Sequence, residues 1–236
     1  MDIQQALVRE LKTLADPERA RQQQAYMKSN MPFWGIQAKA LRQTCRQVFK
    51  AHPCQSKEEW VTQIAYIWDT ATRREERHAA IELLAVNAYR KAWLNTNDLP
   101  LLKRMIKEGA WWDYVDAIAV HDVGYVLTHF KPSATRQMYR WAQEKDLWVR
   151  RTAILSQLRF KADTDEALLT YALDHSLEDT NFFARKAIGW ALREYSRTSP
   201  EFVLDYVRIH AEQLSGLSKR EALRLMLKAG KVPPAL

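Results

Sequence analysis

Apolar side chains recur at steps of three and four residues along almost the whole chain, which is the spacing of one face of an α-helix. The segment 81–88 is an example, because Ile81, Leu84, Ala85 and Ala88 form one stripe. We find no convincing run in which apolar and polar residues alternate, as they do in half-buried strands. The pattern therefore predicts an all-α protein of about a dozen helices.

Helix start signals recur along the chain and are separated by short loops. Asp16–Pro17 has the pattern of an N-cap followed by a proline in the first turn. Ser56 and Ser218 each precede a glutamate by three residues, which is capping-box spacing. Further helices are expected to open at Pro132–Ser133, Thr164 and Ser199–Pro200–Glu201. No long Gly-, Ser- or Pro-rich linker separates the helices, so residues 1–236 are predicted to form a single domain.

A short pattern recurs at an interval of 35 residues. Segments 148–154 (WVRRTAI) and 183–189 (FARKAIG) both place an aromatic residue before two basic residues and a small apolar run, and the same step back from Arg151 reaches Asp116. A period of about 35–40 residues with two helices per unit is typical of HEAT-like solenoids. Chance similarity between amphipathic helices is the alternative. A real period would place Asp116, Arg151 and Lys186 along one concave wall.

The composition narrows the class of protein. A net charge of +8 and a pI of about 9.5 favour a polyanionic partner, most often nucleic acid, although a generally basic surface would give the same charge. Cys45 and Cys54 lack the spacing of a metal cage or a disulfide framework, and a reducing cytoplasm is the expected compartment. The nine tryptophans are expected to be mostly core anchors. No apolar run is long enough for a membrane span, and no signal peptide is evident.

The repeat places an acidic residue among aromatic and basic neighbours. Trp112 lies one helical turn before Asp116, and Trp190 lies one turn after Lys186, with Arg193 continuing that face. The ordinary explanations are that Asp116 is solvated or pairs with Arg151, and that Trp190 packs in the core. Trp111 and Asp113 are expected to be structural, because adjacent positions on a helix diverge by about 100°.

These segments resemble the AlkD family of bacterial DNA alkylation-repair glycosylases. The likeness runs in order through nearly the whole chain, over segments 25–28, 35–37, 111–116, 148–155, 186–195 and 217–222. It implies HEAT-like repeats, no metal or cofactor, and excision of cationic alkylpurines such as N3-methyladenine and N7-methylguanine from duplex DNA. It also implies that the lesion stays stacked in the duplex, whereas many glycosylases flip it into a pocket.

The same resemblance implies roles for individual residues. It makes Asp116 the catalytic carboxylate, Trp112 and Trp190 the active-site tryptophans, Arg151 an active-site arginine and Tyr26 a tyrosine near the DNA. The sequence departs from the family where Arg159 replaces an expected lysine and Ala38 an expected hydroxyl residue. Together with the basic wall, it predicts these DNA-binding residues: Tyr26, Gln37, Arg42, Arg159, Lys161, Lys186, Arg193, Lys219 and Arg220.

The sequence thus predicts a monofunctional alkylpurine DNA glycosylase of base excision repair, acting as a monomer in a bacterial cytoplasm and bound to DNA. We expect Arg151, Lys186, Arg193 and Arg159–Lys161 to face the DNA-binding groove that the concave wall forms. We expect Lys219 to lie beside a helix N-terminus that could bind phosphate. Two alternatives remain: a non-catalytic HEAT-repeat protein that binds distorted or damaged DNA, and a protein–protein scaffold.

Overall fold

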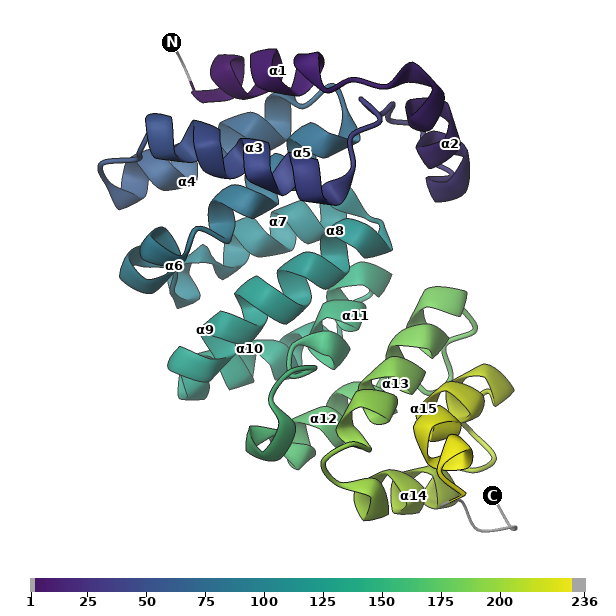
Figure 1. Ribbon diagram of the computed structural model, residues 1–236. Helices are drawn as coiled ribbons and strands as arrows, with labels where there is room; N and C mark the ends of the chain where they lie inside the picture. The colour runs from purple at the N-terminus through teal and green to yellow at the C-terminus, as the bar shows by residue number, and fades with distance from the viewer. Residues whose placement is uncertain (1–2, 231–236) are drawn as a thin grey trace. The chain divides into compact units, whose positions relative to one another are not determined.

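A computed structural model describes residues 3–230, in which all regular secondary structure is helical and no strand is present. The chain divides into two compact units, within residues 1–94 and 95–236 (Figure 1). The all-α prediction is confirmed. The prediction of a single domain over residues 1–236 stays a prediction, and its first two and last six residues lie outside those described.

The first unit contains six α-helices within its described residues. Trp60, Trp68, Leu7, Leu11 and Ile64 are fully buried among them, where α1 packs on α3 and α4, and α5 packs on both of these. The helices are α1 (Ile3–Thr13), α2 (Pro17–Met27), α3 (Ala38–Ala51), α4 (Lys57–Thr70), α5 (Arg74–Leu84) and α6 (Asn87–Trp93).

A buried carboxylate shapes the segment between α2 and α3. Glu75 is 3% exposed and accepts backbone N–H groups from Trp34 (2.9 Å), Gly35 (2.8 Å) and Ile36 (3.1 Å). Gly35 has φ +85°, and a Cβ there would lie 2.1 Å from the Asp16 carbonyl oxygen, so only glycine fits this close approach. The carboxylate therefore fixes the backbone that leads into Gln37, the N-cap of α3.

The second unit stacks its helices in two rows. In the first row α8, α11, α13 and α15 pack in succession; in the second row α10 packs on α12, and α14 packs on α13 and α15. The elements are α7 (Leu99–Gly109), α8 (Trp112–Ala117), α9 (Gly124–His129), α10 (Lys131–Ala142), α11 (Leu147–Leu155), α12 (Glu166–Asp174), α13 (Phe182–Tyr195), α14 (Pro200–Ile209) and α15 (Gly216–Lys228), with 3₁₀ turns η1 (Thr96–Asp98) and η3 (Lys161–Asp163) and a π-helix, η2 (Ile118–Val123).

The N-caps of the helices in this unit recur at the predicted interval of about 35 residues. N-caps of the first row stand at positions 111, 146, 181 and 215, which are steps of 35, 35 and 34 residues. N-caps of the second row stand at 130, 165 and 199, which are steps of 35 and 34. A helical-repeat fold is therefore present, and the spacing read from the sequence reflects its geometry.

Two predicted helix starts need correction. The Asp165 side chain, not Thr164, caps α12, because a carboxylate oxygen accepts the Leu168 N–H at 3.0 Å. Ser215, not Ser218, caps α15 and accepts the Ser218 N–H at 3.0 Å. Ser218 is instead buried and donates its hydroxyl to the Arg185 carbonyl oxygen at 3.0 Å. Capping by Asp16 and Ser56 is confirmed.

Helices α13 and α15 are in close contact at Gly189. A Cβ at this position would lie 2.5 Å from Glu221 Cβ and 3.0 Å from the Ser218 carbonyl oxygen. Gly189→Ala should therefore push the two helices apart and lower the free energy of unfolding by about 1–3 kcal/mol. Thermal melting checks this, with Gly216→Ala as control, because a Cβ at Gly216 meets only the Arg220 side chain at 3.3 Å. Equal melting temperatures for the two variants would contradict the predicted clash.

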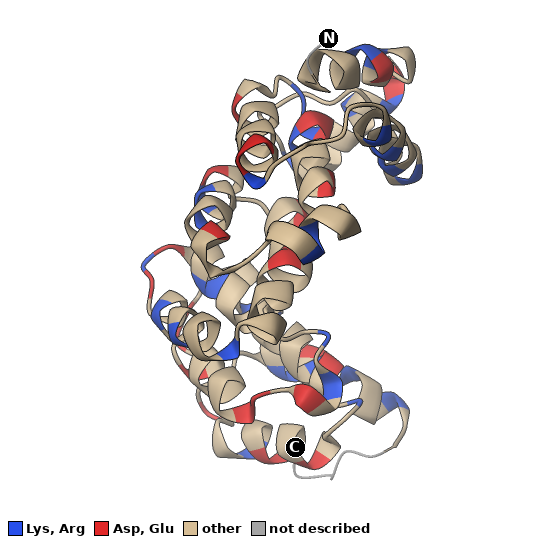
Figure 2. Cartoon of the chain, turned by 90° about the vertical axis from the view of Figure 1, so that its left-hand side faces the viewer, with Lys and Arg blue, Asp and Glu red and all other residues tan. Residues whose placement is uncertain are grey.

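Within the described residues, no helix is long and apolar enough to cross a membrane. Trp60, Trp68, Trp141 and Trp148 are buried, as core anchors should be. The remaining five tryptophans, which include Trp111, Trp112 and Trp190, are partly exposed. Lys and Arg occur on most helices of both units, interspersed with Asp and Glu (Figure 2).

Candidate active site

Asp116 lies near the end of α8, immediately before a change of helix type. The chain continues from α8 into the π-helix η2 and then into α9 without leaving a helical path. Insertions of this wider turn are rare and often occur at functional sites, because they shift the faces that follow relative to those that precede them. The Asp116 side chain is 14% exposed, so it is largely withdrawn from solvent.

Arg151 holds the Asp116 carboxylate with one edge of its guanidinium. Its Nε donates to Oδ1 and its NH2 group to Oδ2, each at 2.7 Å, while NH1 donates to the Phe183 carbonyl oxygen at 2.5 Å. One buried side chain on α11 thus connects α8 with the start of α13. Two parallel bonds of this kind fix both the distance and the plane of the carboxylate.

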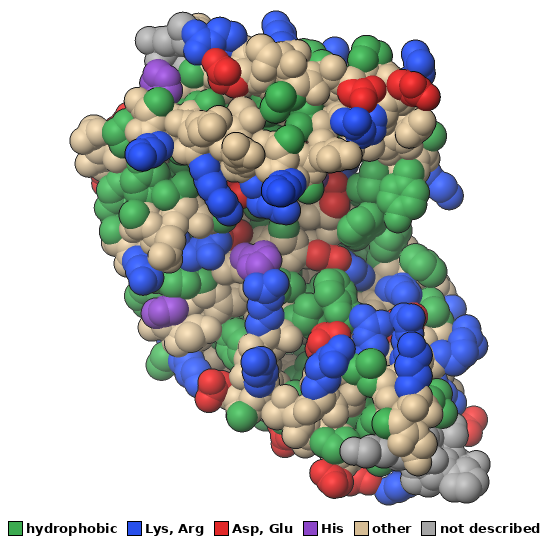
Figure 3. Space-filling view, viewed as in Figure 1, with side chains coloured by type: hydrophobic (Ala, Val, Ile, Leu, Met, Phe, Trp, Pro, Cys, Tyr) green, Lys and Arg blue, Asp and Glu red, His purple; other side chains and the backbone are tan. Residues whose placement is uncertain are grey.

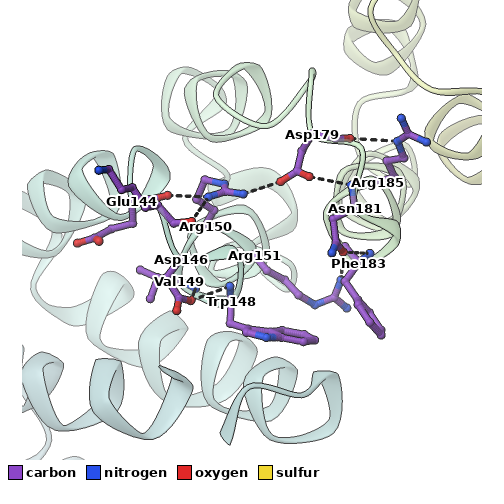
Figure 4. A network of polar contacts seen from close by, with 11 residues as sticks. Glu144, Asp146, Trp148, Val149, Arg150, Arg151, Asp179, Asn181, Phe183 and Arg185 are labelled. Carbon is purple, nitrogen blue, oxygen red and sulfur yellow. Dashed lines mark hydrogen bonds and ion pairs between the residues drawn. The ribbon is translucent and has the colours of Figure 1, made fainter. Parts of the chain in front are cut away.

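The neighbouring arginine secures the loops on either side of this site. Arg150 donates to the Glu144 and Lys145 carbonyl oxygens and pairs with Asp179 at 2.5 Å. Figure 4 shows Arg150 directed toward Asp179 and Arg151 directed toward Phe183. Arg151, predicted to lie on the basic wall, and its neighbour Arg150 are therefore both engaged in holding the first-row helices.

Arg151 itself is only 4% exposed, which corrects the expectation that it faces the groove. The paired state of Asp116, one of the ordinary explanations for that residue, is present in the structure. Such a pair is compatible with catalysis, because each carboxylate oxygen accepts one bond from Arg151 and an ionised oxygen can accept more than one.

Burial raises the pKa of the Asp116 carboxyl above its ordinary value, since it removes water from the charged form. Hydrogen bonds and charge from Arg151 oppose this and lower the pKa, while the negative charge of Asp113 adds to the increase. Burial is the largest of these effects. Asp116 is therefore a carboxylate that takes up a proton at a higher pH than an ordinary aspartate does.

The two predicted active-site tryptophans lie on the helices that Arg151 connects. Trp112 is the first residue of α8, one turn before Asp116, and Trp190 lies two turns after Phe183 on α13. Both are partly exposed. Trp111 packs against Trp148 (ring centroids 6.1 Å apart) and Phe183 (5.2 Å), which agrees with its predicted structural role.

Glu221 is a charged residue of this region that the sequence analysis missed. It lies on α15, and its two oxygens pair with Lys186 Nζ (3.0 Å) and the Arg193 guanidinium (2.5 Å) of α13. These cations hold the pKa of Glu221 below its ordinary value, Lys186 more strongly. The 35-residue period could have identified Glu221, because this residue stands 35 positions after Lys186, one further step of the repeat.

Lys186 and Arg193, predicted to bind DNA, are thus already paired in the structure. Replacing Glu221 by glutamine should release both cations toward phosphates, so affinity for undamaged duplex should rise several-fold at low salt and fall more steeply with salt. Binding titrations over a salt series measure this. The control is Glu212→Gln, which removes the same charge from an exposed position of the same unit. If the two variants bind alike, Glu221 does not restrain these cations.

The other predicted DNA-binding residues lie at the surface. Arg159, Lys161 and Arg220 are exposed and Lys219 is partly exposed, and Figure 3 shows Lys and Arg side chains gathered over α11, α13 and α15. Lys219 lies in the second turn of α15, because the helix opens at Ser215. A pocket of about 730 Å³ lies beside Arg159 and Lys161, between α11, α12 and α13.

The first unit carries the three remaining predicted DNA contacts. Tyr26 is 77% exposed, and Gln37 and Arg42 are exposed at the N-terminal part of α3. Arg74, at the start of α5 in the same unit, is 5% exposed, and its guanidinium carbon lies 5.6 Å from the centroid of the Phe33 ring. The roles of Tyr26, Gln37 and Arg42 in DNA binding stay predictions.

Comparisons with known proteins agree on one family. Residues 7–226 match the family model described as DNA alkylation repair enzyme. The chain is also similar to a solved structure titled "Predicted DNA alkylation repair enzyme from Enterococcus faecalis", with 30% identity and a TM-score of 0.80 over 91% of this chain and 97% of that one. A search of curated proteins gave no match.

Proposed function

This chain belongs to the DNA alkylation repair enzyme family, and from that premise we propose that it is a monofunctional glycosylase for cationic alkylated purines in duplex DNA. The reaction is hydrolysis of the N-glycosidic bond of lesions such as N3-methyladenine and N7-methylguanine, the first step of base excision repair. The observation that supports it most is the largely buried Asp116 carboxylate, which Arg151 holds in one orientation. Asp116 lies on α8, the helix that also carries Trp112.

The chemistry requires little from the protein beyond a negative charge positioned near the sugar of the lesion. An alkylated purine already carries a positive charge, so it departs with the bonding electrons and leaves an oxocarbenium-like sugar. Water then adds to C1′ and loses a proton, which Asp116 can accept. A carboxylate whose pKa is raised is a better proton acceptor near neutral pH than an ordinary aspartate.

The tryptophans would stabilise the same positive charge. The faces of Trp112 and Trp190 are rich in electron density, and each could contribute roughly 0.5–2 kcal/mol beside a cationic sugar. Selectivity then follows from the lesion, because an unmodified purine is a poor leaving group. Exposed cations such as Arg159, Lys161 and Arg220 would grip the phosphates with little sequence preference.

A competing function is supported by the same pair. Because Arg151 occupies both Asp116 oxygens, the pair could be purely structural, and the chain would then be a non-catalytic repeat protein that binds damaged DNA. Substrate discrimination separates the two. We expect release of N7-methylguanine and N3-methyladenine but negligible release of hypoxanthine, a neutral base, from duplexes of otherwise identical sequence. Equal binding of all three duplexes without base release would favour the binding protein.

A further inference from the structure

A second pocket lies in the same unit, between the start of α7 and helix α10. It has a volume of about 460 Å³. None of the residues that the proposed reaction uses belongs to its lining. The lining residues are Thr96, Leu99, Pro100, Lys103, Ser133, Arg136, Gln137, Arg140 and Trp141.

Cations dominate the charged groups of this pocket. Lys103, Arg136 and Arg140 line it, and no Asp or Glu is among the lining residues. Glu144 pairs with Lys103 and offsets one of the three charges. Among residues 3–230, neither Arg136 nor Arg140 has a hydrogen-bond or ion-pair partner for its guanidinium. Both are exposed and lie at i and i+4 on one helix, where like charges repel weakly, so an anion between them would be attracted by both.

The indole of Trp141 gives an independent indication of a ligand. Trp141 lines the pocket, its side chain is 99% buried with 1% exposure, and its Nε1–H group has no acceptor among the described residues. A buried donor without an acceptor is costly and is rare in folded proteins. An anion that reached this group from the pocket would supply the missing acceptor, and it could also bridge the two arginines.

From these features we propose that the α7–α10 pocket binds a phosphate group. Every charged group in its lining donates hydrogen bonds, and a phosphate only accepts them at several oxygens in different directions, so it can satisfy Arg136, Arg140 and Trp141 together. The volume leaves room for a group attached to the phosphate. A free phosphate compound and a DNA backbone phosphate share this chemistry.

The Trp141 indole proton provides a direct readout. The full-length protein is labelled with ¹⁵N-tryptophan. The indole N–H signal of Trp141 is assigned as the one that is missing in Trp141→Phe. Inorganic phosphate, and separately pyrophosphate, is titrated at constant ionic strength against chloride. We expect a saturable shift of the Trp141 signal and at least a tenfold weaker affinity in Arg136→Gln/Arg140→Gln. Arg208→Gln, which removes an exposed arginine from α14, should bind as the wild type does.

A parallel titration with duplex DNA distinguishes the two sources of phosphate. A Trp141 shift on adding undamaged duplex, reversed by pyrophosphate, would identify backbone phosphates as the ligand; a shift with inorganic phosphate alone would identify a free phosphate compound. The proposal is overturned if no addition gives a saturable shift, if chloride gives the same shift, or if the double-arginine variant, folded by circular dichroism, binds phosphate like the wild type. The single-turnover rate of base release at saturating protein should be unchanged in that variant, because none of the residues proposed to act in the reaction lines this pocket, so this test is independent of the proposed reaction.

Discussion

Replacing Asp116 by asparagine should lower the rate of base release by about two to three orders of magnitude, the usual effect of removing one charged group that stabilises a transition state. Asparagine keeps the shape of the side chain but loses the negative charge and the proton acceptor. Affinity for the lesion duplex should stay close to that of the wild type, because the predicted phosphate contacts are made by other residues. Single-turnover release and equilibrium binding measure the two effects separately.

Asp113→Asn is the matched control for this experiment. It removes the same charge from the same helix, at a position predicted to be structural. Normal release by Asp116→Asn, or an equal loss in both variants, would remove Asp116 from the mechanism. Melting of each variant is needed as well, because Asp116→Asn leaves the buried Arg151 guanidinium without its counter-charge.

The second large effect is expected from Arg151→Gln. Arg151 lowers the pKa of Asp116 against the effect of burial, so its removal should raise that pKa further. Release requires the carboxylate and is lost as the pH falls through its pKa. The acid limb of the pH–rate profile should therefore move to higher pH, and the rate at neutral pH should fall.

A structural effect accompanies this change and must be separated from it. Removing one partner of a buried pair typically costs about 3–5 kcal/mol of stability, because the other charge is left unpaired. The double variant Asp116→Asn/Arg151→Gln should regain much of that stability and yet release no base. An unchanged acid limb in a folded Arg151→Gln protein would show that Arg151 does not tune Asp116.

Periodic features of the fold could be predicted from the sequence. The 35-residue step linked Asp116 to Arg151, and the structure joins these two residues directly. The helical class and the caps at Asp16 and Ser56 follow from local chemistry that acts over a few residues. The same step would have reached Glu221 had it been carried once more beyond Lys186.

Features that depend on tertiary packing could not be predicted in this way. Glu75 belongs to a charged run that is typical of a solvated helix face, and only the folded backbone brings three N–H groups to its carboxylate. Arg151 looked like a surface cation because burial of arginine is rare unless a partner is present. Capping by Ser215 rather than Ser218 depends on where α15 meets α13 at Gly189.

The most direct test of the proposed function is single-turnover incubation of the purified protein with a duplex that contains one N7-methylguanine, in the presence of a chelator. We predict first-order appearance of free 7-methylguanine, with an abasic strand that stays intact until it is treated with alkali. Tight binding of the duplex with no release of free base above the protein-free control would contradict the assignment of glycosylase activity.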